Sequence, residues 1–376
     1  MPVPLNTLTS RLSRARDAAR DAGLAVLLIT PSPDLRYLVG ISGESHERLT
    51  CLVLPTEGDP TLVVPALERP GLDGTPVPGL GLEIAEWTDG DDPYALVADL
   101  LGRSGSVPSR AGVGAAMPAV HVLALRAALP ACAQQLASTV LAPLRMRKDS
   151  AEIAALTAAG QAIDRVHARM GEWLRVGRTE AQVGADVAAA IVAEGHTSAA
   201  FVIVGSGPHG ASPHHDVSDR VVQPGDVVVV DIGGPTPEGY FSDCTRTYSL
   251  GEPADPDVAA TYALLHAAQD AAVAAVAPGT TAERVDAAAR APITDAGFGD
   301  RFIHRTGHGI GLAVHEEPYI VAGNDLVLEP GMAFSIEPGI YLPGRWGARI
   351  EDIVFVDDSG ATRLNHRPRE LAVLPV

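Results

Sequence analysis

An internal repeat constrains the fold of this chain more than any other feature. The stretches VGRTEAQV (residues 176–183) and PGTTAERV (residues 278–285) each follow a long helical segment and lead into a shorter helix. Thr179 and Thr281 stand 102 positions apart (281 − 179), and the same offset relates the Val, Ile and Gly residues that follow them. Two similar α+β halves around a shared sheet would bring side chains from both halves into one central cleft.

The shorter helices of the repeat have recognisable start signals. Thr179 with Gln182 predicts a capping box, because each side chain can bind a free backbone N–H of the other residue. Thr280 with Glu283 predicts a second capping box, one position out of the register of the repeat.

The first 145 residues have a different pattern, in which helices and strands alternate. A first helix precedes the apolar strand LAVLLIT, the short helix PDLRYLVG, the strand pair LTCLVL and PTLVVP, and the helices DDPYALVADLLG and AVHVLALRAAL. This order predicts an α/β domain with a mixed sheet. The segment LAPLRMRKDS ends the domain, and Asp149 or Ser150 caps the next helix. We therefore place one domain at residues 1–145 and the other at residues 146–376.

Five side chains of the second domain could bind a pair of metal ions. Asp231 ends the apolar strand VVVVDIGG, Asp243 lies in FSDCTRTYSL, and His308 lies in HRTGHGIGL. Glu337 ends the strand of FSIEPG, and Glu351 lies in the strand ARIEDIVFV. Carboxylates in apolar strands are costly to bury unless a cation neutralises them. Four carboxylates and one imidazole suit Mn²⁺, Co²⁺ or Fe²⁺ better than a sulfur-ligated structural zinc.

The neighbours of these five residues fit the same interpretation. Glycines at 307, 309 and 311 leave space around His308 and permit backbone conformations that other residues avoid. Arg349 is two residues from Glu351, so on one strand both side chains would point to the same face. An arginine in that position can orient one of the ligand carboxylates.

Six segments in order along the chain resemble the motifs of the metallopeptidases with the pita-bread fold: PHHDVSDR, VVVVDIGG, SDCTRTYSL, TGHGIGLAVHEEP, FSIEPGIYL and ARIEDIV. This group includes methionine aminopeptidases, Xaa-Pro aminopeptidases, Xaa-Pro dipeptidases and creatinase. The resemblance runs from about residue 149 to the C-terminus and implies an α+β pita-bread catalytic domain with pseudo-twofold symmetry. It also implies that the ligands of two divalent ions, with manganese expected and cobalt, iron or zinc as alternatives, are Asp231, Asp243, His308, Glu337 and Glu351.

Two divalent cations about 3.5–4 Å apart can share a water and lower its pKa towards neutrality. The resulting hydroxide attacks a carbonyl, and the resemblance makes Glu337 the general base. Arg349 completes the catalytic group as the partner of a ligand carboxylate.

Three further histidines are candidates for substrate contact. By resemblance, His214 in SPHHD and His315 in AVHEEP contact the substrate and support the tetrahedral intermediate. His304 in IHRTGH is a candidate for the substrate pocket, the alternative being a loop histidine satisfied by backbone groups. His215 follows His214 directly, and the motif favours the first of the two as the residue that faces the metals.

The first domain offers one candidate for reading a substrate carboxylate. Arg48, in GESHERLT, could bind such a group with two parallel hydrogen bonds. In this family an N-terminal domain often leans over an active site, sometimes that of a partner subunit, and Asp34 and Arg48 could then lie near the cleft. The alternative is an ordinary surface arginine.

Composition excludes several classes of partner. The net charge of −18 argues against nucleic acid and against an anionic membrane, because both require clustered cations. Three scattered cysteines predict neither a disulfide framework nor a thiolate metal site, and they fit a reducing, cytoplasmic compartment. The Ala-rich stretch near residues 258–277 contains polar residues and predicts a buried helix rather than a membrane span. A homodimer is expected from the family.

These observations predict an Xaa-Pro dipeptidase that acts on Xaa-Pro dipeptides or short proline-containing peptides. Methionine aminopeptidases usually lack so large a first domain, and creatinase-like members lack a complete metal set. The imide bond before proline has no N–H, so a dedicated site is plausible for this substrate. One alternative is an Xaa-Pro aminopeptidase that acts on longer peptides. Another is a non-enzymatic binding protein on the same fold, which would be expected to have lost metal ligands.

Overall fold

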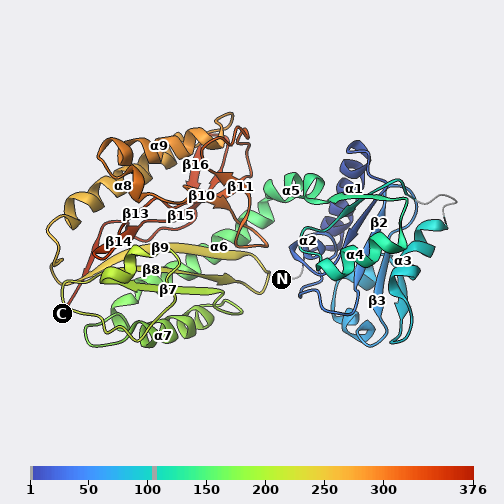
Figure 1. Cartoon of the computed structure of the whole chain (residues 1–376), viewed down its shortest axis with the longest axis horizontal. Helices are drawn as coiled ribbons and strands as arrows, with labels where there is room; N and C mark the ends of the chain where they lie inside the picture. The colour runs from blue at the N-terminus through green and yellow to red at the C-terminus, as the bar shows by residue number, and fades with distance from the viewer. Residues whose placement is uncertain (1–2, 104–107) are drawn as a thin grey trace. The chain divides into compact units, whose positions relative to one another are not determined.

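The computed structural model describes residues 3–103 and 108–376. The chain divides into two compact units, Met1–Arg145 and Met146–Val376 (Figure 1). Among the described residues, no helix combines the length and the apolar character needed to cross a bilayer. The three cysteines are buried and unpaired: Cys51, Cys132 and Cys244.

The first unit is an α/β domain built on one six-stranded sheet with the order β4-β3-β2-β1-β5-β6. The pairs β1–β2 and β2–β3 are antiparallel, whereas β3–β4, β1–β5 and β5–β6 are parallel, which confirms the predicted mixed sheet. Its elements are α1 (Leu5–Asp21), β1 (Val26–Ile29), α2 (Pro33–Val39), β2 (Cys51–Pro55), β3 (Thr61–Pro65), η1 (Arg69–Gly74), η2 (Val77–Gly79), β4 (Glu83–Trp87), α3 (Pro93–Gly102), β5 (Arg110–Val113), α4 (Ala119–Ala128), β6 (Ala133–Leu136) and α5 (Ser138–Met146).

The second unit contains two larger sheets and a two-stranded ribbon. One sheet has the order β17-β9-β8-β7, the other has the order β11-β10-β12-β15-β16, and β13 pairs with β14. The elements of its first half are α6 (Ser150–Ala168), η3 (Met170–Glu172), α7 (Glu180–Ala193), β7 (Phe201–Ser206), η4 (Gly207–Ala211), β8 (Val227–Pro235) and β9 (Phe241–Leu250).

The second half continues with the elements α8 (Val258–Ala275), α9 (Ala282–Asp295), η5 (Gly299–Arg301), β10 (Gly307–Gly309), β11 (Glu316–Ile320), β12 (Ala333–Ile336), β13 (Gly339–Leu342), β14 (Trp346–Arg349), β15 (Asp352–Val356), β16 (Ala361–Arg363) and β17 (Ala372–Leu374). Each half has its own apolar core. One core packs α6 and α7 on β7–β9, and the other packs α8 and α9 on β12–β15; Figure 1 shows the two helix pairs beside these strands.

The two halves repeat the same backbone contacts, as the 102-residue offset predicted. Thr179 forms an isolated bridge with Val221, and Thr281 forms the corresponding bridge with Val327. The first amide of each short helix donates to the returning segment: Glu180 N–H to the Arg220 carbonyl at 3.0 Å, and Ala282 N–H to the Leu326 carbonyl at 2.9 Å. The pseudo-twofold symmetry is therefore built from main-chain contacts and needs few identical side chains.

Helix capping follows the sequence at two of three sites. Asp149 caps α6, and Thr179 caps α7, each in a complete capping box. The predicted capping box at Thr280 is wrong, because α9 starts one residue later with Thr281 as N-cap and without a side-chain cap bond. The cause is the bridge to the returning segment, in which the Thr280 carbonyl accepts from Leu328 N–H at 2.8 Å.

Candidate metal centre and active-site cleft

Two aspartates project from one hairpin onto the same side of a sheet. In the antiparallel pair β8–β9, Asp231 is opposite Thr245 and Gly233 is opposite Asp243. Positions two apart on a strand share a face, so both aspartates lie on one face. Asp231 lies in the middle of β8, which runs on to Pro235, so the prediction that it ends its strand is wrong.

The second half supplies a histidine and two glutamates. His308 lies at the centre of β10, Glu337 follows β12 directly, and Glu351 lies between β14 and β15. The prediction that Glu351 lies within a strand together with Arg349 is therefore wrong, because the chain passes from one strand pair to another at residues 350–351. Both side chains nevertheless line the same cleft.

The glycines beside His308 are required by space. A Cβ atom at Gly307 would lie 1.8 Å from the Ser335 carbonyl oxygen, and one at Gly309 would lie 2.2 Å from the Glu317 oxygen. Neither glycine has a positive φ, so the conformational freedom predicted for them is not what these positions use. β10 is squeezed between β11 and β12, and glycine lets the three strands approach.

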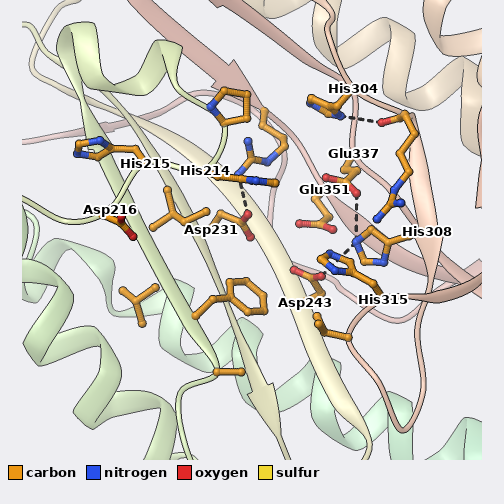
Figure 2. A pocket seen from close by; sticks show the side chains of 18 residues that line it. His214, His215, Asp216, Asp231, Asp243, His304, His308, His315, Glu337 and Glu351 are labelled. Atoms are coloured by element: carbon orange, nitrogen blue, oxygen red, sulfur yellow. Dashed lines mark hydrogen bonds and ion pairs between the residues drawn. The ribbon is translucent and has the colours of Figure 1, made fainter. Parts of the chain in front are cut away.

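These five side chains converge in one cleft with a volume of about 820 Å³ (Figure 2). The His308 Nε2 atom lies 3.2 Å from Glu337 Oε1 and 3.6 Å from Asp243 Oδ2. Its Nδ1 atom lies 3.2 Å from the Gly309 carbonyl, a contact that suits a donating N–H and leaves Nε2 free to bind a cation. Ser335 accepts from the His308 amide and donates to Glu337 Oε1, both at 3.0 Å, which links the two residues.

The electrostatics of the cluster call for a cation. Burial, together with repulsion between the carboxylates, raises the pKa of Asp243 and of Glu351 well above the ordinary values. Burial would lower the pKa of His308, but the neighbouring Glu337 and Asp243 raise it. Four carboxylates share this space with one buried guanidinium, that of Arg349. Burying several negative charges together is unfavourable unless bound cations compensate them.

Unused acceptor atoms point to the same conclusion. Among the described residues, no hydrogen-bond donor reaches the buried atoms Asp231 Oδ1 and Glu351 Oε1. Ligand atoms of Asp243, His308 and Glu351 lie within 4.8 Å of one another. Buried acceptors without donors are rare unless an ion or water completes them. The oxygen-rich donor set therefore fits hard divalent cations.

Arg349 supports this cluster through three hydrogen bonds. It donates from Nη2 to Asp231 Oδ2 at 2.6 Å, from Nη1 to the Tyr341 hydroxyl at 2.8 Å, and from Nε to the Thr245 hydroxyl at 3.1 Å. Thr245 in turn donates to Glu351 Oε2 at 2.8 Å. Sequence reasoning identified Arg349 but missed two hydroxyls. Thr245 contacts Glu351 and Arg349, 106 and 104 positions away. Tyr341 contacts Arg349 and His304, 8 and 37 positions away. No local motif marks either hydroxyl as part of the site.

Two of the other histidines predicted at the site, His304 and His315, differ in their contacts with protein groups. His304 lies 2.7 Å from the Arg305 carbonyl through Nδ1 and 2.8 Å from the Tyr341 hydroxyl through Nε2, so both ring nitrogens bind protein groups. His315 packs edge-on against His308, with ring centroids 4.3 Å apart. Burial and the neighbouring His308 lower the pKa of His315 to about 4, so its ring is neutral near pH 7.

The two adjacent histidines of SPHHD have separate environments. Both line the cleft, but Figure 2 shows His214 beside Asp231 and His215 further from the carboxylate cluster. His215 donates to Glu180 Oε2 at 2.7 Å. This arrangement fits the motif's preference for the first histidine.

In the first unit, Arg48 is already engaged by acidic neighbours. Its Nε and Nη2 atoms donate to the two oxygens of Asp89, each at 3.0 Å, and its Nη1 donates to Glu47 at 2.8 Å. Asp34 pairs with Arg145 at 2.7 Å. A substrate carboxylate would have to compete with two anions for Arg48, whose role in substrate binding stays a prediction.

Comparison with known protein families identifies the class. Residues 154–358 match metallopeptidase family M24, and residues 11–147 match the creatinase/prolidase N-terminal domain. The chain belongs to metallopeptidase family M24. It is a metallopeptidase with an α/β creatinase-type first domain and a pita-bread catalytic domain, as the sequence predicted. The family implies divalent metal ions, and the donor set described above fits them.

Individual relatives resemble the chain over its full length. It is 60% identical over 366 residues to a probable dipeptidase PepE of Mycobacterium tuberculosis, covering 97% of this chain and 96% of that protein. An Xaa-Pro dipeptidase of Lactobacillus delbrueckii subsp. lactis is 36% identical, with 97% and 99% coverage. The crystal structure of dipeptidase PepE from Mycobacterium ulcerans is 58% identical, with a TM-score of 0.95 and full coverage of both chains. A prolidase structure from Thermococcus sibiricus is 37% identical, with a TM-score of 0.90 and 97% and 98% coverage.

Proposed function

We propose that the protein is an Xaa-Pro dipeptidase that uses two divalent metal ions. The observation that carries the proposal is the set of five potential metal ligands in the cleft. Two of their buried carboxylate oxygens accept no hydrogen bond from the described residues. Full-length relatives that are named Xaa-Pro dipeptidase or prolidase support the choice of substrate.

The metals would be held by Asp231, Asp243, His308, Glu337 and Glu351, with manganese as the expected ion. When bound, such a pair of cations lowers the pKa of water towards neutrality and polarises the scissile carbonyl. Arg349 fixes the orientation of Asp231 through the 2.6 Å hydrogen bond, so one ligand oxygen is neutralised by protein and the other is left for a metal.

The residues around this centre would handle the proton and the substrate. Glu337 takes the proton of the attacking water, since its carboxylate is ionised and lies beside His308. His315 is neutral near pH 7, so it can donate a hydrogen bond to the oxygen on which negative charge develops. His214, on the Asp231 side of the cleft, contacts the substrate from the other side (Figure 2).

The position of Arg305 supports dipeptides rather than longer peptides as the substrates. It lines the cleft and stacks on the Tyr319 ring, with 4.5 Å from the guanidinium carbon to the ring centroid. Among the described residues, no carboxylate lies within ion-pairing distance of this guanidinium. The free carboxylate of an Xaa-Pro dipeptide lies one residue beyond the scissile bond, where an unpaired arginine in the same cleft could bind it. This residue was missed at the sequence level, where Arg48 was the candidate for the same task.

Hydrolysis of Ala-Pro beside Ala-Pro-Ala, with added Mn²⁺ and with chelator, tests the proposal. We expect Mn²⁺-dependent cleavage of the dipeptide and little cleavage of the tripeptide. Preference for the tripeptide would indicate an Xaa-Pro aminopeptidase instead. Absence of turnover of both peptides by the metal-loaded protein would contradict the proline-specific assignment.

A further inference from the structure

The loop that carries His214 lacks the support that strands give to the other site residues. Residues 212–220 run between η4 and β8 without helix or strand. His315, on the opposite side of the cleft, directly precedes β11, which is hydrogen bonded to β10. His214 therefore needs a different support if it is to keep a fixed position in the cleft.

A buried carboxylate lies behind this loop. Glu180, the first residue of α7, is fully buried, and its Oε1 accepts from the Ser206 amide at 2.8 Å and the Ser206 hydroxyl at 2.6 Å. Its Oε2 accepts from His215 Nε2 at 2.7 Å and from the Ser218 hydroxyl at 2.6 Å. His209 Nδ1 lies 3.1 Å from both oxygens. One side chain thus collects donors from two separate parts of the chain.

These donors fall into a fixed group and a loop group. Ser206 ends β7 and His209 lies in η4, so both belong to regular structure. His215 and Ser218 belong to the loop. The backbone already holds the far end of the loop, because the Ala181 amide donates to the Ser218 carbonyl at 2.9 Å. The bond from His215 to Glu180 therefore ties down the part of the loop next to His214.

The internal repeat shows that Glu180 is specific to this half. Its equivalent in the second half, 102 positions on, is Ala282, which makes the same main-chain contact but has no carboxylate (282 − 180 = 102). In that half the residues after His315 form β11 and are held by strand pairing. The first half thus has the Glu180 carboxylate where the second half has the strand β11.

The cluster has the composition of a zinc site but the distances of hydrogen bonds. Ligand atoms around a tetrahedral zinc, with bonds of about 2.0–2.1 Å, lie roughly 3.3 Å apart. The His215–Glu180 distance of 2.7 Å is shorter, and both carboxylate oxygens also accept serine hydroxyls. Burial raises the pKa of Glu180, but hydrogen bonds from Ser206, Ser218 and His215 outweigh burial and lower it to about 2. The anion is therefore satisfied by donors alone.

We propose that Glu180 is a positioning residue that holds His215, and through it fixes His214 in the active-site cleft. The inference rests on the proposed function, in which His214 contacts the substrate. It adds a residue on the far side of the loop that touches neither substrate nor metal.

His215→Ala and His209→Ala form a matched pair for the test. Both remove an imidazole from the same carboxylate, but only His215 belongs to the loop, and Glu180 keeps its serine donors in each variant. We measure kcat and KM for Ala-Pro with Mn²⁺, and amide hydrogen exchange of peptides that cover residues 211–220. For His215→Ala we expect kcat to fall about tenfold or more with little change in KM, as for contacts made in the transition state. Amide exchange in the loop should also be faster in His215→Ala than in the wild type. For His209→Ala, kcat should stay within about twofold of the wild-type value.

Glu180→Gln and Glu180→Ala provide the second comparison. Glutamine keeps an acceptor for Ser206 and presents an amide that the other tautomer of His215 can accept from, so it should retain more kcat than alanine. A double variant of Glu180→Ala with His215→Ala should lose no more than the larger single loss, because the two residues act through one bond.

Three results would overturn the inference. Wild-type kcat in His215→Ala would show that the bond is dispensable. Equal losses in His209→Ala and His215→Ala would indicate a shared role of both imidazoles, such as holding a cation. Lost activity with unchanged loop exchange would indicate that His215 contacts the substrate itself. Failure of the wild type to cleave Ala-Pro would instead contradict the proposed function, while the exchange measurement would still test the support of the loop.

Discussion

At the scale of single residues, the cleft contains carboxylate oxygens that the protein satisfies and others that it leaves without a donor. Arg349 neutralises one oxygen of Asp231, and Thr245 donates to one oxygen of Glu351. In each carboxylate the other oxygen has no donor among the described residues. The protein thus leaves one acceptor on each residue, which is the arrangement expected of a site completed by cations.

Arg305 leads to a prediction at this scale. Arg305→Gln should raise KM for Ala-Pro about tenfold or more, because the bond lost is charge-assisted, with a smaller change in kcat. A dipeptide with an amidated C-terminus has no carboxylate to read, so the variant and the wild type should treat it alike. Arg301→Gln, on an exposed arginine of η5, is the matched control. An equal effect of Arg305→Gln on both substrates would contradict a carboxylate-reading role.

Single residues also show where sequence reasoning stops. The five proposed ligands stand in motifs that can be read locally, and the structure brings all five into one cleft. Tyr341, Thr245 and Glu180 could not be found in this way, because a hydroxyl or a carboxylate gains its role from its partners in the folded chain, which here lie 8 to 106 positions away. Such partners become neighbours only when the strands are paired.

At the scale of elements, β10 illustrates how closely packed strands restrict sequence. Gly307→Ala would place a methyl group 1.8 Å from the Ser335 carbonyl oxygen, so β10 or β12 must move. We expect a loss of about 3 kcal/mol in the free energy of unfolding and no measurable peptidase activity, because overpacking in a filled core displaces the backbone. Gly171→Ala is the control, since its Cβ would lie 3.5 Å from Leu374. Urea unfolding checks both variants, and equal stabilities would contradict this account.

The packing of α6 on β9 should make stability depend on pH. His167 lies 2.9 Å from the Tyr248 hydroxyl and 3.1 Å from the Cys244 carbonyl. Burial, aided by the nearby Arg246, lowers the pKa of His167 to about 3, whereas an unfolded histidine titrates near about 6.5. Between about pH 3 and about pH 6.5 the unfolded state therefore binds one more proton than the folded state. The contribution to stability is complete above about pH 6.5 and is lost as the pH falls towards about 3.

The measurement is the free energy of unfolding from pH 6.5 to 4.5. His167→Gln should reduce its slope against pH by up to about 1.4 kcal/mol per pH unit, the value for one proton. His46→Gln, on an exposed histidine of the first unit, should keep the wild-type slope. Identical slopes in His167→Gln and the wild type would show that this histidine is not the group that titrates.

Elements were predictable where local signals decide them and less so where tertiary contacts do. The long apolar strands and the capping box at Thr179 follow directly from the sequence. The start of α9 does not, because a main-chain bridge to Leu328 overrides the local signal at Thr280. The break before Glu351 was missed for a similar reason, since ARIEDIVFV has the composition of one strand but pairs with two different partners.

At the scale of the whole molecule, the repeat explains where the proposed metal ligands lie. The first half supplies Asp231 and Asp243 from one hairpin, and the second half supplies His308, Glu337 and Glu351. Each half has its own apolar core, and Val227 of β8 in the first half also belongs to the core of the second half. The carboxylates meet between the halves, where their repulsion opposes association unless cations are present.

This arrangement predicts that metal binding stabilises the fold and that one ligand can be removed without harm to the metal-free chain. At free Mn²⁺ of about 100 times Kd, a site absent from the unfolded state adds about 2.7 kcal/mol to the free energy of unfolding. We therefore expect Mn²⁺ to raise the Tm of the metal-depleted wild type. Asp243→Asn should show a much smaller rise.

Without metal, Asp243→Asn should be as stable as the wild type or more stable, because it removes one charge from a group of buried carboxylates that raise one another's pKa. Asp164→Asn is the control, since this mostly buried carboxylate accepts from the His366 amide elsewhere in the same unit. It should keep the full Mn²⁺-dependent rise in Tm. An unchanged rise in Asp243→Asn, or a metal-free Tm well below that of the wild type, would contradict the assignment of Asp243 as a metal ligand.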